Sequence, residues 1–255
     1  MTDLVHLTHE SPVARLTLNR TDARNALSLD LLDALHDALD DLASSDAHVL
    51  VVTGAGRAFC AGMDLKAVII AESGDDTLGA RLLRSLAELT LKIRALPMVT
   101  VASVNGAAIG GGCGLACVCD LCVSHADAKL GFPEVDLGLC PAVIAPWVVK
   151  KLGAARARAA LLQGGVMTGS EAHALGLVDH LADDRDALPT RIDEIAARIA
   201  SGGTDALRAT KALLNTIDGS DDARPVLDGA ERSARILKTP EAQAALAARM
   251  NPDKP

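Results

Sequence analysis

The chain has 255 residues, a formal net charge of −8 and only three aromatic side chains, two phenylalanines and one tryptophan. Acidic charge without a basic stripe disfavours duplex nucleic acid and anionic membranes as partners, and scarce aromatics disfavour binding of single-stranded bases. We expect no signal peptide and no membrane span. Four of the six cysteines lie in one short run, whereas a secreted disulfide framework spreads its cysteines between elements. We therefore expect free thiols and a cytoplasmic protein.

The first part of the chain is predicted to alternate strands and helices. Strands are expected near residues 4–9, 13–19, 48–53 and 98–104, where apolar residues alternate with polar ones or run together. A helix is predicted from Ser28, a good N-cap, to about residue 44, with leucines at helical spacing. A second helix is predicted over 77–96, ending before a proline.

The second part is predicted to become wholly helical. A strand is expected at 121–124, a loop at 131–141, helices at 143–152 and 154–163, a capping box at Thr168 and Glu171, and a strand at 177–181. Beyond residue 186 the pattern is helical, with breaks at glycines and a proline. The chain is therefore predicted to have an α/β core (1–185) that holds the site, and a C-terminal helical region (186–255).

Several common sites are absent from the sequence. There is no GxxxxGK[ST], HExxH or GxSxG motif, and the glycines at 54–59 follow a strand but lack the third glycine of a dinucleotide fingerprint. The seven histidines are scattered and are interpreted as surface or core residues. The cysteines at 113–122 lack a second CxxC knuckle for zinc, so we interpret them as buried packing and expect no metal.

Two glycine-containing loops are the strongest functional signal. Residues 58–64 and 105–112 each follow a predicted strand and precede a predicted helix start. Such turns leave backbone N–H groups unpaired, so two adjacent loops would offer two donors to one oxygen. That arrangement is an oxyanion hole, suited to a thioester oxygen that becomes an enolate. The alternative is that both are merely tight connections.

Five ordered segments resemble the crotonase superfamily of enoyl-CoA hydratases and isomerases, nearest to bacterial methylglutaconyl-CoA hydratase-like members. They are NRTDARNALS (19–28), VVTGAGRAFCAGMDL (51–65), ASVNGAAIGGGCGLACVCD (102–120), GFPEVDLGLCPA (131–142) and MTGSEAHALGLVD (167–179). The resemblance implies a spiral of ββα units, a C-terminal helical trimerisation region, and a homotrimer or hexamer. It also implies an acyl-CoA substrate and no other cofactor.

The resemblance also implies site residues. The oxyanion hole would be formed by the backbone N–H groups of Met63 and Gly111, and Glu134 would be the catalytic acid and base. Further contacts to substrate or CoA are implied for Arg24, Ala26, Ala61, Asp64, Leu65, Lys66, Gly114 and Pro141.

The sequence departs from the two-glutamate pattern of the best-known hydratases. Gly114 stands where the first glutamate is expected, so Glu134 is left alone and Gly114 is expected to leave room, or a water, at that place. One carboxylate can activate water and then protonate the α-carbon, which gives hydration. It can also move a proton from one carbon of the acyl group to another, which is the reaction of a 3,2-enoyl-CoA isomerase. A non-catalytic acyl-CoA-binding relative is the third possibility. The acyl group, branched or glutaconyl-type, is expected to be selected by residues 67–79, where Glu72, Asp75 and Asp76 are candidate second acids.

Overall fold

The computed structural model describes residues 3–70 and 78–250. Most of the predicted specificity segment 67–79, including Glu72, Asp75 and Asp76, lies outside the described residues. Within the described part of the chain, no helix combines the length and apolar character needed to cross a bilayer.

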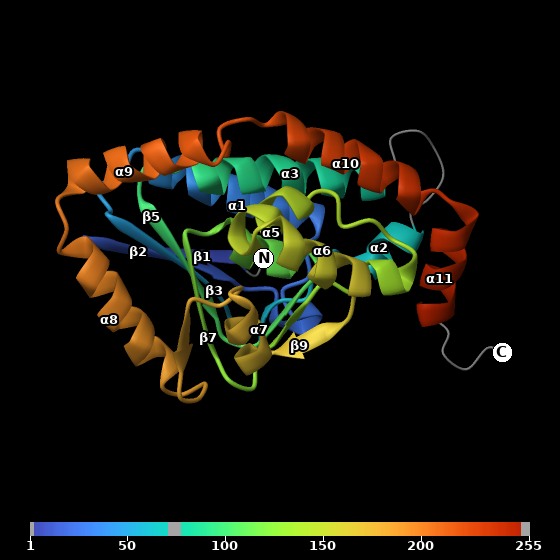
Figure 1. Cartoon of the computed structure of the whole chain (residues 1–255), viewed down its shortest axis with the longest axis horizontal. Helices are drawn as coiled ribbons and strands as arrows, with labels where there is room; N and C mark the ends of the chain where they lie inside the picture. The colour runs from blue at the N-terminus through green and yellow to red at the C-terminus, as the bar shows by residue number, and fades with distance from the viewer. Residues whose placement is uncertain (1–2, 71–77, 251–255) are drawn as a thin grey trace.

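A six-stranded sheet forms the centre of the molecule (Figure 1). Its strand order is β1-β2-β3-β5-β7-β10, in which β1 and β2 are antiparallel and the other neighbours are parallel. The strands are β1 (Val5–Glu10), β2 (Val13–Leu18), β3 (Val49–Gly54), β5 (Val99–Val104), β7 (Leu121–His125) and β10 (His180–Ala182). The predicted strands near 4–9, 13–19, 48–53, 98–104 and 121–124 are thereby confirmed.

A second, four-stranded sheet has no counterpart among the predicted elements. It consists of β4 (Ala58–Cys60), β6 (Ala107–Ile109), β8 (Lys129–Gly131) and β9 (Val166–Thr168), in that order. Each strand has three residues, which is too short for a periodic pattern to show. Strands β4 and β6 lie in the two candidate loops, just before Gly62 and Gly110, and their pairing holds the two loops side by side.

The described residues form eleven α-helices and two short 3₁₀ turns, η1 (Thr21–Ala23) and η2 (Val135–Leu137). In chain order the helices are α1 (Leu29–Ala43), α2 (Leu65–Ile70), α3 (Leu78–Ala95), α4 (Gly111–Val118), α5 (Ala145–Leu152), α6 (Ala154–Gln163), α7 (Gly169–Leu175), α8 (Leu188–Ala200), α9 (Thr204–Ile217), α10 (Arg224–Leu237) and α11 (Pro240–Met250). The helical pattern predicted beyond residue 186 is confirmed as α8 to α11.

The elements repeat as ββα units. One strand of the large sheet, one strand of the small sheet and then a helix recur as β3-β4-α2, β5-β6-α4 and β7-β8-α5. The spiral of ββα units implied by the crotonase resemblance is thereby confirmed, together with the helical C-terminal part.

The large sheet is buried on both faces at β3 and β5, which explains why these two strands read as continuous apolar runs. Val49 and Val51 of β3 face the cluster that contains Leu188 and Ile192 of α8. The intervening β3 residues join the main core on the opposite face. Figure 1 shows α8 on one side of the strands, and α1 and α3 on the other beneath α9 and α10.

Two predicted helix caps are confirmed, whereas one predicted strand begins at a different residue. Ser28 accepts a hydrogen bond from the Leu31 N–H at 3.3 Å, and Thr168 and Glu171 form the predicted capping box. The strand predicted at 177–181 is wrong at its start, since β10 begins at His180. The reason is that the Leu177 and Val178 N–H groups both donate to the Ala172 carbonyl and close the end of α7.

Asp120, just before β7, pairs with cations from α3 and α9. The Asp120 carboxylate lies 3.0 Å from Arg94 Nη1 and 2.9 Å from Lys211 Nζ of α9. Asp120 also accepts hydrogen bonds from the Thr100 N–H and hydroxyl. Burial is the main cause lowering the pKa of Lys211, and the Asp120 carboxylate opposes it. The C-terminal helices are therefore joined to the core by specific charge pairs as well as apolar contacts.

Candidate active site

A cavity of about 100 Å³ lies between the two predicted loops, α3, α10 and the segment around Glu134. Of the predicted site residues, it brings together Ala61, Met63, Leu65, Gly111, Glu134 and Pro141. Its other lining residues are almost wholly apolar. They are Gly62, Leu83, Leu86, Ile109, Gly110, Pro133, Leu137, Leu139, Cys140, Val143, Ile144, Ser233 and Leu237.

Glu134 places its carboxyl group in this cavity from the residue just before η2. The Oε2 atom is buried and has no hydrogen-bond partner among the described residues. Burial is the largest cause raising the pKa of Glu134 from 4.5 to about 7, and the nearby Asp136 charge adds to it. A carboxyl group with a pKa near neutrality is suited to both taking and returning a proton.

Gly110 brings the backbone of the second loop against this carboxyl group. Its φ of +55° is a conformation that glycine adopts without strain. A Cβ atom on Gly110 would lie 2.9 Å from Glu134 Oε1 and 3.3 Å from its Cδ. The glycine is therefore required both by the turn and by the close approach of the carboxyl group.

The Gly111 N–H belongs to the first residue of α4, so it has no partner one turn earlier in the helix. The Met63 N–H is free for a different reason. In the bridge between Leu27 and Met63, the Leu27 N–H donates to Gly62 O at 2.8 Å and the Asp64 N–H donates to Leu27 O at 3.0 Å. The N–H of Met63 therefore points away from Leu27.

The two loops touch each other. A Cβ atom on Gly62 would lie 2.6 Å from Ile109 O and 3.7 Å from Gly111 N. No backbone hydrogen bond from Met63 or Gly111 is formed to any acceptor within residues 3–70 and 78–250. Two free N–H donors and one carboxyl group thus meet at the cavity, and this arrangement can polarise a carbonyl oxygen while moving a proton beside it.

The remaining predicted contacts, Arg24, Ala26, Asp64, Lys66 and Gly114, do not line the cavity. Arg24 and Lys66 are exposed on the surface near the first loop. The Asp64 carboxylate is already engaged, because it lies 2.8 Å from Arg20 Nη1 and accepts from the Ala67 N–H in the first turn of α2. The carbonyl of Ala26 accepts from the same Arg20 side chain at 3.0 Å.

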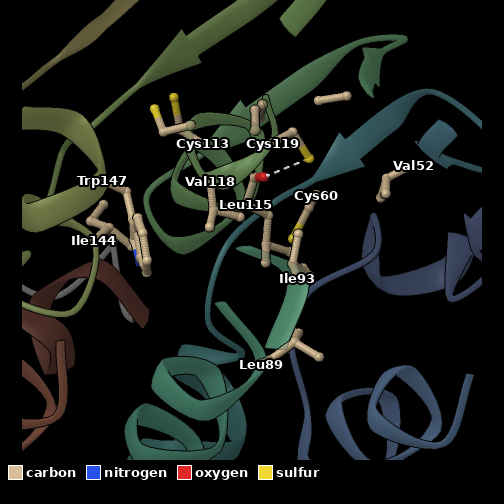
Figure 2. Packing of buried hydrophobic residues seen from close by; sticks show 14 of the residues in the cluster. Val52, Cys60, Leu89, Ile93, Cys113, Leu115, Val118, Cys119, Ile144 and Trp147 are labelled. Carbon is tan, nitrogen blue, oxygen red and sulfur yellow. Dashed lines mark hydrogen bonds between the residues drawn. The ribbon is translucent and has the colours of Figure 1, made fainter. Parts of the chain in front are cut away.

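The expectation that Gly114 leaves room for another group is wrong. A Cβ atom on Gly114 would lie 2.2 Å from Cγ2 and 2.8 Å from Cβ of Ile144. Figure 2 shows Ile144 and Trp147 beside α4, the helix that carries Gly114. The Ile144 side chain fills the space, so glycine at 114 allows α4 and the segment before α5 to pack closely.

The cysteine run packs in the core, as predicted. Cys113, Cys117, Cys119 and Cys122 are buried free thiols in the main hydrophobic cluster. Cys119 Sγ donates to the Leu115 carbonyl one turn earlier, as Figure 2 shows. Burial raises the pKa of the Cys119 thiol to about 12, which disfavours the thiolate that metals require. In the described part of the chain, no group of three histidine, cysteine or acidic side chains is placed to hold a metal ion.

Sequence reasoning missed the contribution of the helices to the cavity wall. Leu83 and Leu86 come from α3, whereas Ser233 and Leu237 come from α10, inside the predicted C-terminal region 186–255. The helices that carry them were predicted, but only the tertiary structure specifies which of their buried side chains reach the cavity. The division at residue 185 stays a prediction, and the cavity draws residues from both sides of it.

Comparisons with known proteins show what this chain is similar to. The family model described as enoyl-CoA hydratase/isomerase matches residues 8–232. A crotonyl-CoA hydratase from Syntrophomonas wolfei is 35% identical over 218 residues, which cover 82% of this chain and 80% of the relative. The 2,3-dehydroadipyl-CoA hydratase of Escherichia coli is 33% identical over 216 residues, covering 84% and 82%. The crystal structure of an enoyl-CoA hydratase from Mycobacterium avium matches with a TM-score of 0.85 at 31% identity, covering 100% of this chain and 99% of that one.

Proposed function

Since this chain is an enzyme that belongs to the enoyl-CoA hydratase/isomerase family, we propose that it adds water across the 2,3-double bond of an acyl-CoA thioester, or removes it. The observation that carries the proposal is the buried, unpartnered carboxyl group of Glu134 beside the backbone of Gly110 and Gly111. No cofactor takes part beyond the coenzyme A of the substrate.

In the proposed mechanism the Met63 and Gly111 N–H groups donate to the thioester oxygen. Glu134, ionised, takes a proton from water while the oxygen of that water bonds to C3 and the double-bond electrons move onto the thioester as an enolate. The two N–H donors stabilise the negative oxygen. Glu134 then returns its proton to C2, which restores the thioester and the ionised carboxylate. One carboxyl group thus serves both proton transfers, as a pKa near neutrality permits.

The rest of the substrate is proposed to lie along the first loop. Residues Met63 to Lys66 follow the cavity edge, and the exposed cations of Arg24 and Lys66 are available to the phosphates of coenzyme A. The contacts proposed for Ala26 and Asp64 are backbone contacts, since the Asp64 carboxylate is held by Arg20.

We further propose a cytoplasmic homotrimer or hexamer. The free buried thiols fit a reducing compartment. Helix α9 leaves the large apolar side chains of Leu213, Leu214 and Ile217 exposed, and a face of this kind is suited to contact with a second copy.

A 3,2-enoyl-CoA isomerase is the second candidate. The observation that favours it is Ile144, whose side chain makes the wall next to Gly114 apolar and leaves no second acid there to hold water. The same Glu134 would then take a proton from C2 of a 3-enoyl thioester and return it to C4.

Product analysis separates the candidates. Crotonyl-CoA incubated in ¹⁸O-labelled water should gain one labelled water in the product mass, as a hydratase requires. Conversion of 3-pentenoyl-CoA to 2-pentenoyl-CoA without mass change would instead establish the isomerase. Tight calorimetric binding of butyryl-CoA without turnover of either substrate would leave a non-catalytic binding protein.

The pH dependence of the rate follows from the pKa of Glu134. Its carboxylate must be ionised to act as a base, and its pKa is raised to about 7. We therefore expect kcat/KM to fall about tenfold per pH unit below pH 7 and to level off above it. Asp136→Asn removes a charge that raises this pKa, so it should move the inflection to lower pH. A profile that is flat between pH 5.5 and pH 8.5 would contradict the assignment of Glu134.

A further inference from the structure

Among the described residues, the cavity beside Glu134 offers no cationic group to an acyl chain. Within the described residues, Glu134 alone carries a charge among the side chains that line it. The thiol of Cys140 and the hydroxyl of Ser233 are the remaining polar side-chain groups there. A distal carboxylate on the acyl group would therefore enter a space without a cation and near a group of its own charge.

Ser233 is also unavailable as a donor to the substrate. Its hydroxyl donates to the Cys140 carbonyl at 2.7 Å and accepts from the Ala142 N–H at 3.2 Å. Both bonds hold α10 against the segment that carries Pro141. The hydroxyl hydrogen is thus used within the protein, and the wall that α10 contributes is apolar toward the cavity.

The space itself is small. At about 100 Å³ it is smaller than an apolar cavity of roughly 150 Å³ that holds benzene. Leu86 narrows it at the oxyanion end, since a Cβ on Gly111 would lie 3.1 Å from Leu86 Cδ2. Ile144 closes the side next to Gly114. Only a few carbon atoms beyond the thioester fit without movement of these side chains.

From the apolar lining, the engaged Ser233 hydroxyl and the small volume, we infer that the acyl group is a short, uncharged aliphatic enoyl chain of about four or five carbons, straight or branched, and that acyl groups with a distal carboxylate are excluded. This inference rests on the proposed function for its catalytic readout. Of the two acyl types expected from the sequence, it retains the branched type and excludes the glutaconyl type.

The test compares four substrates under one set of conditions: crotonyl-CoA, tiglyl-CoA, 2-decenoyl-CoA and glutaconyl-CoA. We expect kcat/KM for crotonyl-CoA or tiglyl-CoA to exceed the value for glutaconyl-CoA and for 2-decenoyl-CoA by at least about tenfold. Values for glutaconyl-CoA or 2-decenoyl-CoA within tenfold of the better short substrate would overturn the inference.

The affinities of saturated thioesters test this inference independently of the proposed function. Calorimetry with butyryl-CoA and glutaryl-CoA requires no catalysis, and butyryl-CoA should bind at least about tenfold more tightly. If no enoyl thioester is turned over but this preference holds, the proposed hydration fails and the inference about the cavity stands. Equal affinities would overturn the inference even in an active enzyme.

A variant with an enlarged cavity should shift the substrate preference toward longer acyl chains. Leu83→Ala removes part of the α3 wall at a half-buried position, so it should raise the ratio of kcat/KM for 2-hexenoyl-CoA to that for crotonyl-CoA by about tenfold. The matched control is Leu162→Ala on α6, whose side chain is exposed and outside the cavity. An equal change of the ratio in both variants, or none in Leu83→Ala, would contradict the assignment of this wall.

Discussion

Glu134→Gln is expected to lower kcat by about a thousandfold or more while leaving the fold intact. One carboxyl group performs both proton transfers in the proposed mechanism, and among the described residues that line the cavity no other acid can replace it. The amide has nearly the same shape but does not take a proton from water. Steady-state hydration of crotonyl-CoA measures the loss.

The same variant should be more stable than the wild type at high pH. The pKa of Glu134 is higher in the folded protein, about 7, than its ordinary value of 4.5. Its contribution to stability is therefore complete below about pH 4.5 and is lost as the pH rises through 7. Because glutamine does not ionise, Glu134→Gln should gain on the order of 3 kcal/mol relative to the wild type between pH 4.5 and pH 8.

Loss of activity with a gain in stability distinguishes a catalytic role from a structural one. Denaturant unfolding at the two pH values measures the gain. Glu88→Gln is the matched control, since Glu88 lies on the exposed face of α3 in a surface pair with Arg84. It should change neither kcat nor the pH dependence of stability. An active Glu134→Gln enzyme, or one whose stability follows the wild-type pH dependence, would refute the role given to this carboxyl group.

Gly114→Glu, which introduces the missing second carboxyl group, is expected to destabilise the protein by about 3 kcal/mol or more. Its Cβ would lie 2.2 Å from Ile144 Cγ2, among the buried apolar side chains of the main core. Both the steric conflict and the burial of a charge oppose folding. The melting temperature and the urea midpoint of the purified variant measure the effect.

The double variant Gly114→Glu/Ile144→Ala supplies the decisive comparison. Removal of the Ile144 branch opens the space that the new side chain needs, so part of the lost stability should return. The two substitutions should therefore be less destabilising together than the sum of their separate effects, by about 1–3 kcal/mol. Ile144→Ala alone measures the cost of the cavity it creates. Additive effects would show that Ile144 does not exclude a side chain at 114.

The large-scale fold was accessible from the sequence because its signals are local and repeated. The buried runs of β3 and β5 and the leucine spacing of α1 fall within windows long enough for their periodicity to be visible. The small sheet could not be predicted from the sequence, because Ala58–Cys60 forms a strand by pairing with Ala107 and Ala108, which lie far along the chain. Its structure depends on contacts that no short window contains.

The residues of the candidate site also fall into those that the sequence predicted and those that it did not. Glu134, Met63 and Gly111 lie in motifs whose loops could be identified, and the structure brings all three to one cavity. Ile144 carried no sequence signal, because its importance arises from a contact with Gly114 across the core. The glycine at 114 suggested an open space. The structure shows instead that the Ile144 side chain occupies this space, so a residue without a side chain is needed at 114.

The hydrogen bonds of Ser233 to the 140–142 segment have a consequence for biosynthesis. The two loops and Glu134 leave the ribosome well before α10, whose Ser233 and Leu237 close the cavity. Segments nearer the N-terminus begin to fold first during translation. Until α10 is translated, the cavity lacks the wall that Ser233 and Leu237 provide, so we expect the proposed acyl-thioester chemistry only after α10 has docked.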